Sequence, residues 1–234
     1  MSFANKTVVI TGATGNLGRA VARLFMDQDA RVVLVDLHRD ALLETFGMET
    51  AQLMLAPANL LEPENASGVI EAAVERYQRV DVLCNLAGGF HMGEAVHETS
   101  ATSWNGMFDM NVRTLLNITH AVVPHMVGMG GGKIVNVSAY SAQKGAARMG
   151  AYIASKSAVM RLTESMAAEL RHKNINVNCV LPTILDTPEN RAAMPDADPA
   201  CWVAPHDLAS VIRFLASEDA RAVHGASLPV TGLS

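Results

Sequence analysis

Tyr152 and Lys156, four residues apart, are the pair in this sequence with the clearest capacity for proton transfer. On a helix, this spacing places both side chains on one face. An ammonium beside a phenol favours the phenolate and lowers the pKa of the tyrosine toward a useful acid/base range. A YxxxK pattern alone is equally typical of an ordinary exposed pair, so its interpretation depends on the rest of the chain.

A glycine-rich turn, TGATGNLG, lies between the first apolar run and the first helical pattern. Glycines there let the backbone approach a pyrophosphate, and the following helix N-terminus offers free N–H groups and the positive end of its dipole. In this strand–turn–helix context the pattern predicts a dinucleotide site. Its predicted residues are Gly12, Thr14, Gly15, Asn16, Leu17 and Gly18.

Asp36 ends the second apolar run, eighteen residues after Gly18. A carboxylate at that point can accept hydrogen bonds from both adenosine-ribose hydroxyls, and it repels a 2′-phosphate. A solvated turn aspartate is the alternative interpretation, and nearby Arg39 could soften the discrimination. The pattern favours NAD over NADP.

The fourth apolar run ends in Asn85 and continues with the small residues Ala87, Gly88 and Gly89. Small residues at the carboxyl end of a central parallel strand let a ligand lie against the backbone. A plain tight turn is the alternative. The prediction places cofactor contacts at Asn85, Ala87 and Gly88 here, and further ones at Leu37, Asn59 and Leu60, which follow the second and third apolar runs.

Strand-like and helical patterns alternate along the chain to position these residues. The predicted strands are Thr7–Ile10, Arg31–Val35, Leu53–Ala56, Val82–Asn85, Lys133–Val137, Ile175–Leu181 and Leu228–Val230. The predicted helices are Leu17–Gln28, Arg39–Phe46, Pro63–Gln78, Thr102–Val127, Tyr152–His172 and His206–Ala216. Continuous apolar strands alternating with helices predict an α/β Rossmann fold: a doubly wound, seven-stranded parallel sheet with helices on both faces, forming one domain over residues 1–234. The irregular stretch Pro182–Pro205, with five prolines, is expected to be a functional loop.

Composition excludes several other classes of protein. The net charge is −5, and no basic block indicates nucleic acid or an anionic membrane surface. No apolar run is long enough to span a bilayer, and no signal peptide is evident. Three scattered cysteines without a CxxC fit a reducing cytoplasm, and His91 and His97 lack a third ligand at useful spacing for a metal.

Several motifs occur in order: TGATGNLG, Asp36, NLAGG, Asn111 in MNVRTLLN, NVSAYS and YIASK. Together they resemble the short-chain dehydrogenase/reductase family over essentially the whole chain. The resemblance implies that Tyr152 exchanges the substrate proton, that Lys156 binds the nicotinamide ribose and tunes Tyr152, and that Asn111 holds a water linking Lys156 to solvent. It also implies a homodimer or homotetramer built on two long helices.

Two positions depart from the commoner pattern of that family. Asn16 stands where the middle glycine is usual, and Ala139 stands thirteen residues before Tyr152, where the family has its catalytic serine. Ser138 would serve if the backbone were shifted by one residue. Both departures resemble the dihydropteridine reductases of this family, as does the stretch LPTILDTPENR. That resemblance places Pro182, Leu185 and Thr187 in a loop closing over nicotinamide and substrate.

The predicted activity is hydride transfer between NAD(H) and a small carbonyl or quinonoid, pterin-like substrate, with Tyr152 as acid/base. The alternative enzyme is an NADP-dependent 3-oxoacyl or ketone reductase, which Asp36 and Ala139 disfavour. A nucleotide-sensing protein without catalysis is a third hypothesis, and the presence of Tyr152, Lys156 and Asn111 speaks against it.

Overall fold

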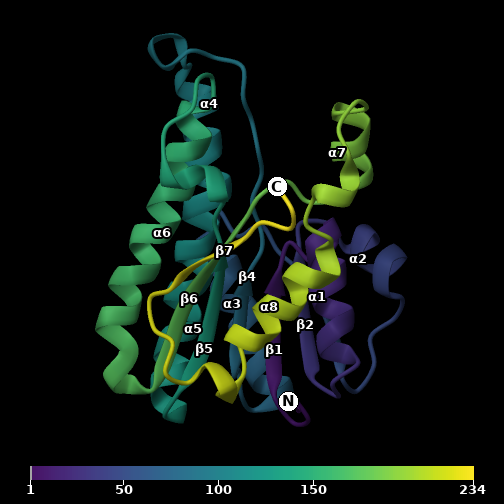
Figure 1. Ribbon diagram of the computed structural model, residues 1–234. Coiled ribbons are helices and arrows are strands. Elements are labelled where there is room, and N and C mark those ends of the chain that lie inside the picture. The colour runs from purple at the N-terminus through teal and green to yellow at the C-terminus, as the bar shows by residue number, and fades with distance from the viewer. Residues whose placement is uncertain (1) are drawn as a thin grey trace.

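The computed structural model describes residues 2–234 and contains one seven-stranded parallel sheet (Figure 1). The strand order is β3-β2-β1-β4-β5-β6-β7. The strands are β1 (Thr7–Thr11), β2 (Arg31–Asp36), β3 (Leu53–Pro57), β4 (Val82–Asn85), β5 (Gly132–Val137), β6 (Ile175–Pro182) and β7 (Ser227–Val230). This order confirms the predicted doubly wound Rossmann fold. The chain reverses direction across the sheet between β3 and β4, and this leaves a crevice beyond the carboxyl ends of β1 and β4.

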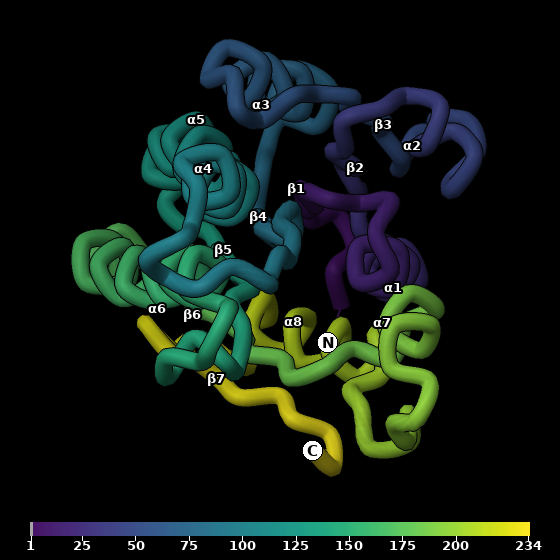
Figure 2. The backbone as a smooth tube through the Cα atoms, turned by 90° about the horizontal axis from the view of Figure 1, so that it is seen from above, coloured from purple at the N-terminus to yellow at the C-terminus, as the bar shows by residue number. Residues whose placement is uncertain are grey.

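Helices cover both faces of the sheet (Figure 2). They are α1 (Asn16–Met26), α2 (Arg39–Phe46), α3 (Pro63–Tyr77), α4 (Ala101–Phe108), α5 (Thr114–Met129), α6 (Gly150–Leu170), α7 (Pro188–Ala193) and α8 (Pro205–Leu215). One core cluster packs α1 and α8 against the sheet, and a second packs α3, α5 and α6 against the opposite face. The inner strands are buried along most of their length, which explains their continuous apolar sequences. No helix within residues 2–234 is long and apolar enough to cross a membrane.

The helix predicted over Thr102–Val127 is observed as continuous helical backbone over residues 101–129, but it contains a π-helical turn that was not predicted. The structure divides this stretch into α4, a π-helical turn at Asp109–Arg113, and α5. A π turn adds one residue to a helical turn and rotates the following face, and such turns are frequent at functional sites. Asn111 lies in this turn and its side chain is buried.

The stretch Pro182–Pro205 is less irregular than predicted. It contains α7 and a 3₁₀ turn at Pro199–Cys201. The Thr187 hydroxyl accepts a hydrogen bond from the Asn190 N–H and so caps α7, which begins with Pro188 at its first position. These are ordinary helix-start signals.

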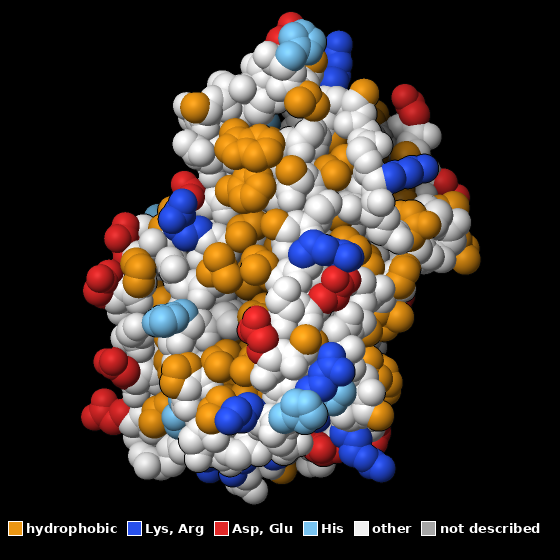
Figure 3. All heavy atoms as spheres, turned by 90° about the vertical axis from the view of Figure 1, so that its left-hand side faces the viewer, with side chains coloured by type: hydrophobic (Ala, Val, Ile, Leu, Met, Phe, Trp, Pro, Cys, Tyr) orange, Lys and Arg blue, Asp and Glu red, His pale blue; other side chains and the backbone are white. Residues whose placement is uncertain are grey.

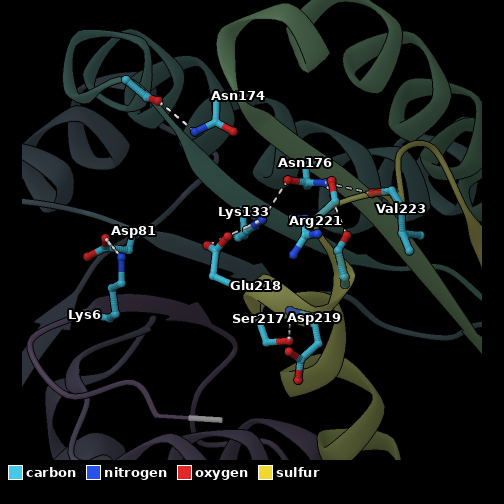
Figure 4. Close-up of polar contacts among 12 residues, drawn as sticks. Lys6, Asp81, Lys133, Asn174, Asn176, Ser217, Glu218, Asp219, Arg221 and Val223 are labelled. Atoms are coloured by element: carbon cyan, nitrogen blue, oxygen red, sulfur yellow. Dashed lines mark hydrogen bonds and ion pairs between the residues drawn. The ribbon is translucent and has the colours of Figure 1, made fainter.

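Charged side chains are buried at the amino ends of the strands, opposite the crevice (Figure 4). Asp81 is 7% exposed and accepts hydrogen bonds from the Thr7 N–H at 2.9 Å and Arg79 Nε at 2.8 Å. The Lys6 ammonium lies 3.2 Å from the same carboxylate. Lys133, also buried, donates to Asn176 Oδ1 at 2.8 Å. Asp81 therefore joins the start of β1 to the start of β4.

We expect Asp81→Asn to lower the free energy of unfolding at pH 7 by about 1–3 kcal/mol. Burial alone would raise the pKa of Asp81, but hydrogen bonds from Arg79 and Thr7 and the Lys6 charge hold this pKa below its usual value. A lowered pKa gives stability that is complete above the unfolded-state pKa and is lost as pH falls through the folded one. The difference between variant and wild type should therefore shrink below about pH 4.

Urea unfolding at pH 7 and at about pH 3.5 measures this difference. Asp29→Asn, at an exposed position, is the matched control and should leave stability nearly unchanged. Equal stability of Asp81→Asn and wild type at pH 7 would show that the buried carboxylate contributes nothing.

Candidate active site

The glycine-rich turn after β1 is built so that only glycine fits at two of its positions. Gly12 has a φ of +65°, and a Cβ there would approach the Ala87 Cα to 2.9 Å. A Cβ on Gly18 would lie 2.1 Å from the Gly12 carbonyl oxygen. Gly15 is under less constraint, since its nearest contact would be 3.4 Å. The turn therefore packs tightly against the end of β4 and leaves its backbone facing the crevice.

The amino end of α1 has the properties of a phosphate site. Its N-cap, Gly15, provides no side-chain hydrogen bond, and its first turn has no acidic residue. The first N–H groups of a helix lack internal partners and carry the positive end of its dipole. The pyrophosphate of a dinucleotide fits this cradle, with Gly12, Thr14, Gly15, Asn16, Leu17 and Gly18 as the residues that would hold it.

Asp36 is fixed at the carboxyl end of β2 by neighbouring donors. Its Oδ2 accepts from the Thr14 N–H at 2.9 Å and the Thr14 hydroxyl at 2.7 Å, and its Oδ1 accepts from the Leu37 N–H at 2.8 Å. A carboxylate oxygen can accept about two hydrogen bonds, so Oδ1 retains capacity for a ribose hydroxyl. The Leu37 side chain is exposed and lies beside this position.

The loop after β4 borders the crevice through its backbone. Thr11, which the sequence reasoning missed, accepts from the Ala87 N–H at 3.1 Å and so fixes this loop. The Asn85 side chain is buried and donates to Asn136 Oδ1 at 2.9 Å, so it faces the sheet interior rather than the crevice. A Cβ on Gly88 would lie 2.7 Å from Asn111 Oδ1 and 3.1 Å from Lys156 Nζ. Gly88 is therefore the point where the cofactor cradle meets the predicted catalytic residues.

Asn111, in the π turn, is held by hydrogen bonds to Gly89 and Ser155. Its Oδ1 accepts from the Gly89 N–H at 2.9 Å, and its Nδ2 donates to the Gly89 carbonyl at 3.1 Å and to Ser155 Oγ at 3.0 Å. Ser155 was missed from the sequence, although its position three residues after Tyr152 on a helix could have indicated it. Asn111 thus ties the loop after β4 to α6.

Burial sets the ionisation of both Tyr152 and Lys156. Lys156 is 7% exposed and donates to the Val137 carbonyl at 3.1 Å, and its burial lowers its pKa to about 8. Burial raises the pKa of Tyr152 to about 12. The predicted lowering of the Tyr152 pKa by Lys156 is therefore wrong for the protein alone, because desolvation dominates and the ammonium is directed to Val137. The Phe90 ring packs edge-on against Tyr152, with centroids 4.8 Å apart.

Ser138 does not present its hydroxyl to the crevice. It is 2% exposed, and its Oγ donates to the Lys156 carbonyl at 2.7 Å. This contact turns the hydroxyl toward the turn of α6 that carries Lys156, and the catalytic role expected of Ser138 stays a prediction that its alanine variant tests. Ala139, the next residue, is buried and supplies no donor.

The remaining predicted cofactor residues lie at or after the carboxyl ends of β3 and β6. Their side chains differ in how far they are exposed to solvent. Asn59 and Leu60 follow β3, and the Leu60 side chain is buried in the core, so it could contact a cofactor only through its backbone. Leu185 forms an isolated bridge with Val203, and Thr187 is buried at the start of α7. Pro182 is the last residue of β6.

The Rossmann fold, the glycine-rich turn at the crevice, the carboxylate at the end of β2 and the meeting of Asn111 and Lys156 at Gly88 are the features of a dinucleotide-dependent oxidoreductase. The chain belongs to the short-chain dehydrogenase/reductase family. The sequence profile of the family described as short chain dehydrogenase matches residues 6–198 of this chain. The protein is accordingly an NAD(P)-dependent oxidoreductase.

Relatives within the family act on varied substrates. The chain is 29% identical to a 3-oxoacyl-(acyl-carrier-protein) reductase of Thermotoga maritima, over 99% of this chain and 98% of that protein. It is 30% identical to a cyclohexanol dehydrogenase of Acinetobacter sp., over 98% and 95%. Among solved structures, a 3-ketoacyl-(acyl-carrier-protein) reductase from Brucella melitensis complexed with NADH is 25% identical, with a TM-score of 0.88 and coverage of 99% and 98%. ElxO with NADP bound is 26% identical, with a TM-score of 0.89 and coverage of 97% of each chain.

Proposed function

We propose that the protein moves hydride between NAD(H) and a small carbonyl or quinonoid, pterin-like substrate. The observation that carries this proposal is the meeting of Lys156, Asn111 and the cofactor cradle at Gly88, with Tyr152 on the same helix as Lys156. The cofactor, when bound, supplies the hydride. The chain's own residues supply orientation and the proton.

Tyr152 serves as the proton donor in the reduction direction. Because its pKa is raised to about 12, the phenol is protonated at neutral pH and can donate to a substrate oxygen or nitrogen that gains negative charge. Lys156, with a pKa near 8, is mostly charged at neutral pH. Its ammonium favours the phenolate that remains after the proton has moved.

The surroundings of Tyr152 favour a substrate that needs little stabilisation by a second donor. Ala139 occupies the position at which the family usually has its catalytic serine. The neighbouring Ser138 hydroxyl donates to the Lys156 carbonyl. The exposed Phe90 ring offers an apolar surface beside Tyr152 for a planar substrate. A reactive quinonoid compound develops less alkoxide charge than a ketone, so it loses less when the hydroxyl is absent.

An NADP-dependent 3-oxoacyl or ketone reductase is the second candidate. The names of the reductase of Thermotoga maritima and of ElxO with NADP bound favour it. Asp36 and Ala139 disfavour it. A nucleotide-sensing protein that has lost catalysis is the third candidate, and turnover of any substrate would exclude it.

One assay separates these candidates. NADH and NADPH oxidation is followed with quinonoid dihydropterin, quinones, 3-oxoacyl thioesters and simple ketones. The proposal predicts the highest kcat/KM with NADH and a quinonoid compound. A preference for a 3-oxoacyl thioester with NADPH would overturn it in favour of the second candidate.

Asp36 is expected to make the protein bind NADH more tightly than NADPH. The carboxylate is held at the end of β2 by Thr14, where it would face a 2′-phosphate. Repulsion between these like charges should weaken NADPH binding by about 1–3 kcal/mol, or roughly five- to 150-fold. Fluorescence titration of both dissociation constants, in wild type and Asp36→Asn, measures the effect. Equal affinities in wild type would mean that Asp36 does not face the ribose.

We propose that the protein is a homodimer or homotetramer assembled through its two long helical segments, α4 with α5 and α6. Hydrophobic side chains gather on the side of the molecule shown in Figure 3. On α4 the rings of Trp104 and Phe108 are stacked, and Leu116 is exposed on α5. Large exposed apolar patches mark interaction surfaces. Light scattering should give a mass two or four times the 24.9 kDa of one chain, and Trp104→Glu should shift it toward one chain. A wild-type mass of one chain would contradict this assignment.

We propose further that residues 1–234 act as one NAD(P)-binding domain located in the cytoplasm. The three free cysteines support a reducing compartment. Cell fractionation tests the location: recovery from an oxidising compartment would contradict it.

A further inference from the structure

Helix α7 stands apart from the core of the protein, above α1 (Figures 1 and 2). None of its residues is buried. Its base is fixed, because Leu185 forms a bridge with Val203 and the Asp186 N–H donates to the Val203 carbonyl at 2.9 Å. The helix is therefore an arm with a fixed base, and its position depends on its contacts with the rest of the protein.

The hydrogen bonds of the α7 arm are nearly all internal. Arg191 pairs with Asp186, and the Asn190 side chain donates to the Leu185 carbonyl at 2.8 Å. Within residues 2–234, one hydrogen bond joins residues 186–198 to a part of the chain outside 184–203. In it, Asn16 Nδ2 donates to Glu189 Oε2 at 2.8 Å.

Both partners are suited to this contact. Asn16 is the first residue of α1 and occupies the position where the commoner family pattern has a glycine, which has no side chain to donate. Glu189 lies in the first turn of α7, and its pKa is held below its usual value by its own backbone N–H, the Thr187 hydroxyl and the Asn16 amide. It is a carboxylate at neutral pH and brings a negative charge to the uncapped positive end of α1.

We propose that Asn16 and Glu189 form a latch, a contact that holds α7 against the amino end of α1. By holding α7, the latch positions the loop 182–205 over the crevice in which the dinucleotide is proposed to bind. Asn16 and Glu189 are both positioning residues. The latch joins the element that would hold the cofactor phosphates to the loop that carries Leu185 and Thr187. Its consequence for the cofactor rests on the proposed function, whereas the latch itself exists in the protein alone.

Hydrogen–deuterium exchange of the cofactor-free protein tests the latch directly. Asn16→Ala and Glu189→Ala should each speed exchange of the backbone amides of 189–194 by about three- to tenfold, the range expected for one solvent-exposed hydrogen bond. The double variant should exchange no faster than either single variant, because both remove the same contact. Glu189→Gln keeps an acceptor oxygen and should lie between wild type and Glu189→Ala. Glu44→Ala, at an exposed position on α2, is the control and should leave these amides unchanged.

Unchanged exchange in both single variants, or additive effects in the double variant, would overturn the latch. The rate of NADH release by stopped flow is the second readout, and Glu189→Ala should raise it by about threefold or more. A protein that binds no nicotinamide cofactor but shows the exchange changes would keep the latch and refute the proposed function. Normal NADH binding with unchanged exchange would refute the latch alone. Slower release in Glu189→Ala would mean that the carboxylate repels the cofactor, and would overturn the proposed effect of the latch on the cofactor crevice.

Discussion

Tyr152→Phe is expected to lower kcat by about 10²–10⁴-fold, the contribution typical of a positioned general acid. The substitution removes the phenolic hydroxyl and keeps the ring, so the edge-on contact with Phe90 remains. In the proposed reaction the hydroxyl acts on the substrate rather than on the cofactor. The dissociation constant of NADH should therefore stay within about twofold of the wild-type value, because the loss falls on the transition state.

Steady-state kinetics with the best substrate from the panel, together with NADH titration, measures both quantities. Tyr77→Phe is the matched control: its hydroxyl is buried in α3 without a hydrogen-bond partner, far from the crevice in the fold, and its loss should leave kcat unchanged. Lys156→Ala should reduce both kcat and NADH affinity, because this residue is also expected to contact the ribose. Near-normal turnover by Tyr152→Phe would place the acid elsewhere.

The sequence was sufficient to predict the sheet and the tight glycine-rich turn after β1 because both depend on local patterns. β4 was predicted with its observed bounds, and the other strands differ by at most one residue at either end, since continuous apolar runs specify buried parallel strands. The glycines of the turn after β1 follow from a backbone constraint that Gly12 and Gly18 display directly. Spacing on one helix face also indicated the Tyr152–Lys156 pair.

The features that were missed depend on contacts between distant segments. A π turn around Asn111 cannot be distinguished from an α-helix by hydrophobic periodicity, because a single added residue leaves the pattern nearly intact. The raised pKa of Tyr152 follows from desolvation by the assembled fold, whereas the sequence suggested only the nearby charge. The Asn85 and Ser138 side chains turn inward to Asn136 and to the Lys156 carbonyl, which are 51 and 18 residues away along the chain.

Ala139→Ser is expected to raise turnover of simple ketones by roughly ten- to a hundredfold, and to raise turnover of quinonoid compounds much less. Position 139 is where this family has its catalytic serine, and a hydroxyl there would donate to the oxygen that becomes an alkoxide in ketone reduction. A quinonoid substrate develops less of this charge, so an added donor gains less. Ala139 is 5% exposed, and the β-hydroxyl adds a single atom to its side chain.

Ser138→Ala is the paired variant that decides which residue faces the substrate. Its hydroxyl donates to the Lys156 carbonyl, so its loss should change turnover of the best substrate by less than about threefold, the effect of a lost positioning contact. Rates of both variants on one ketone and one quinonoid compound are the measurement. A loss of about 10²-fold or more in Ser138→Ala would identify Ser138 as the oxyanion donor. It would also remove the argument for a quinonoid substrate, since the protein would then have the hydroxyl that ketone reduction requires.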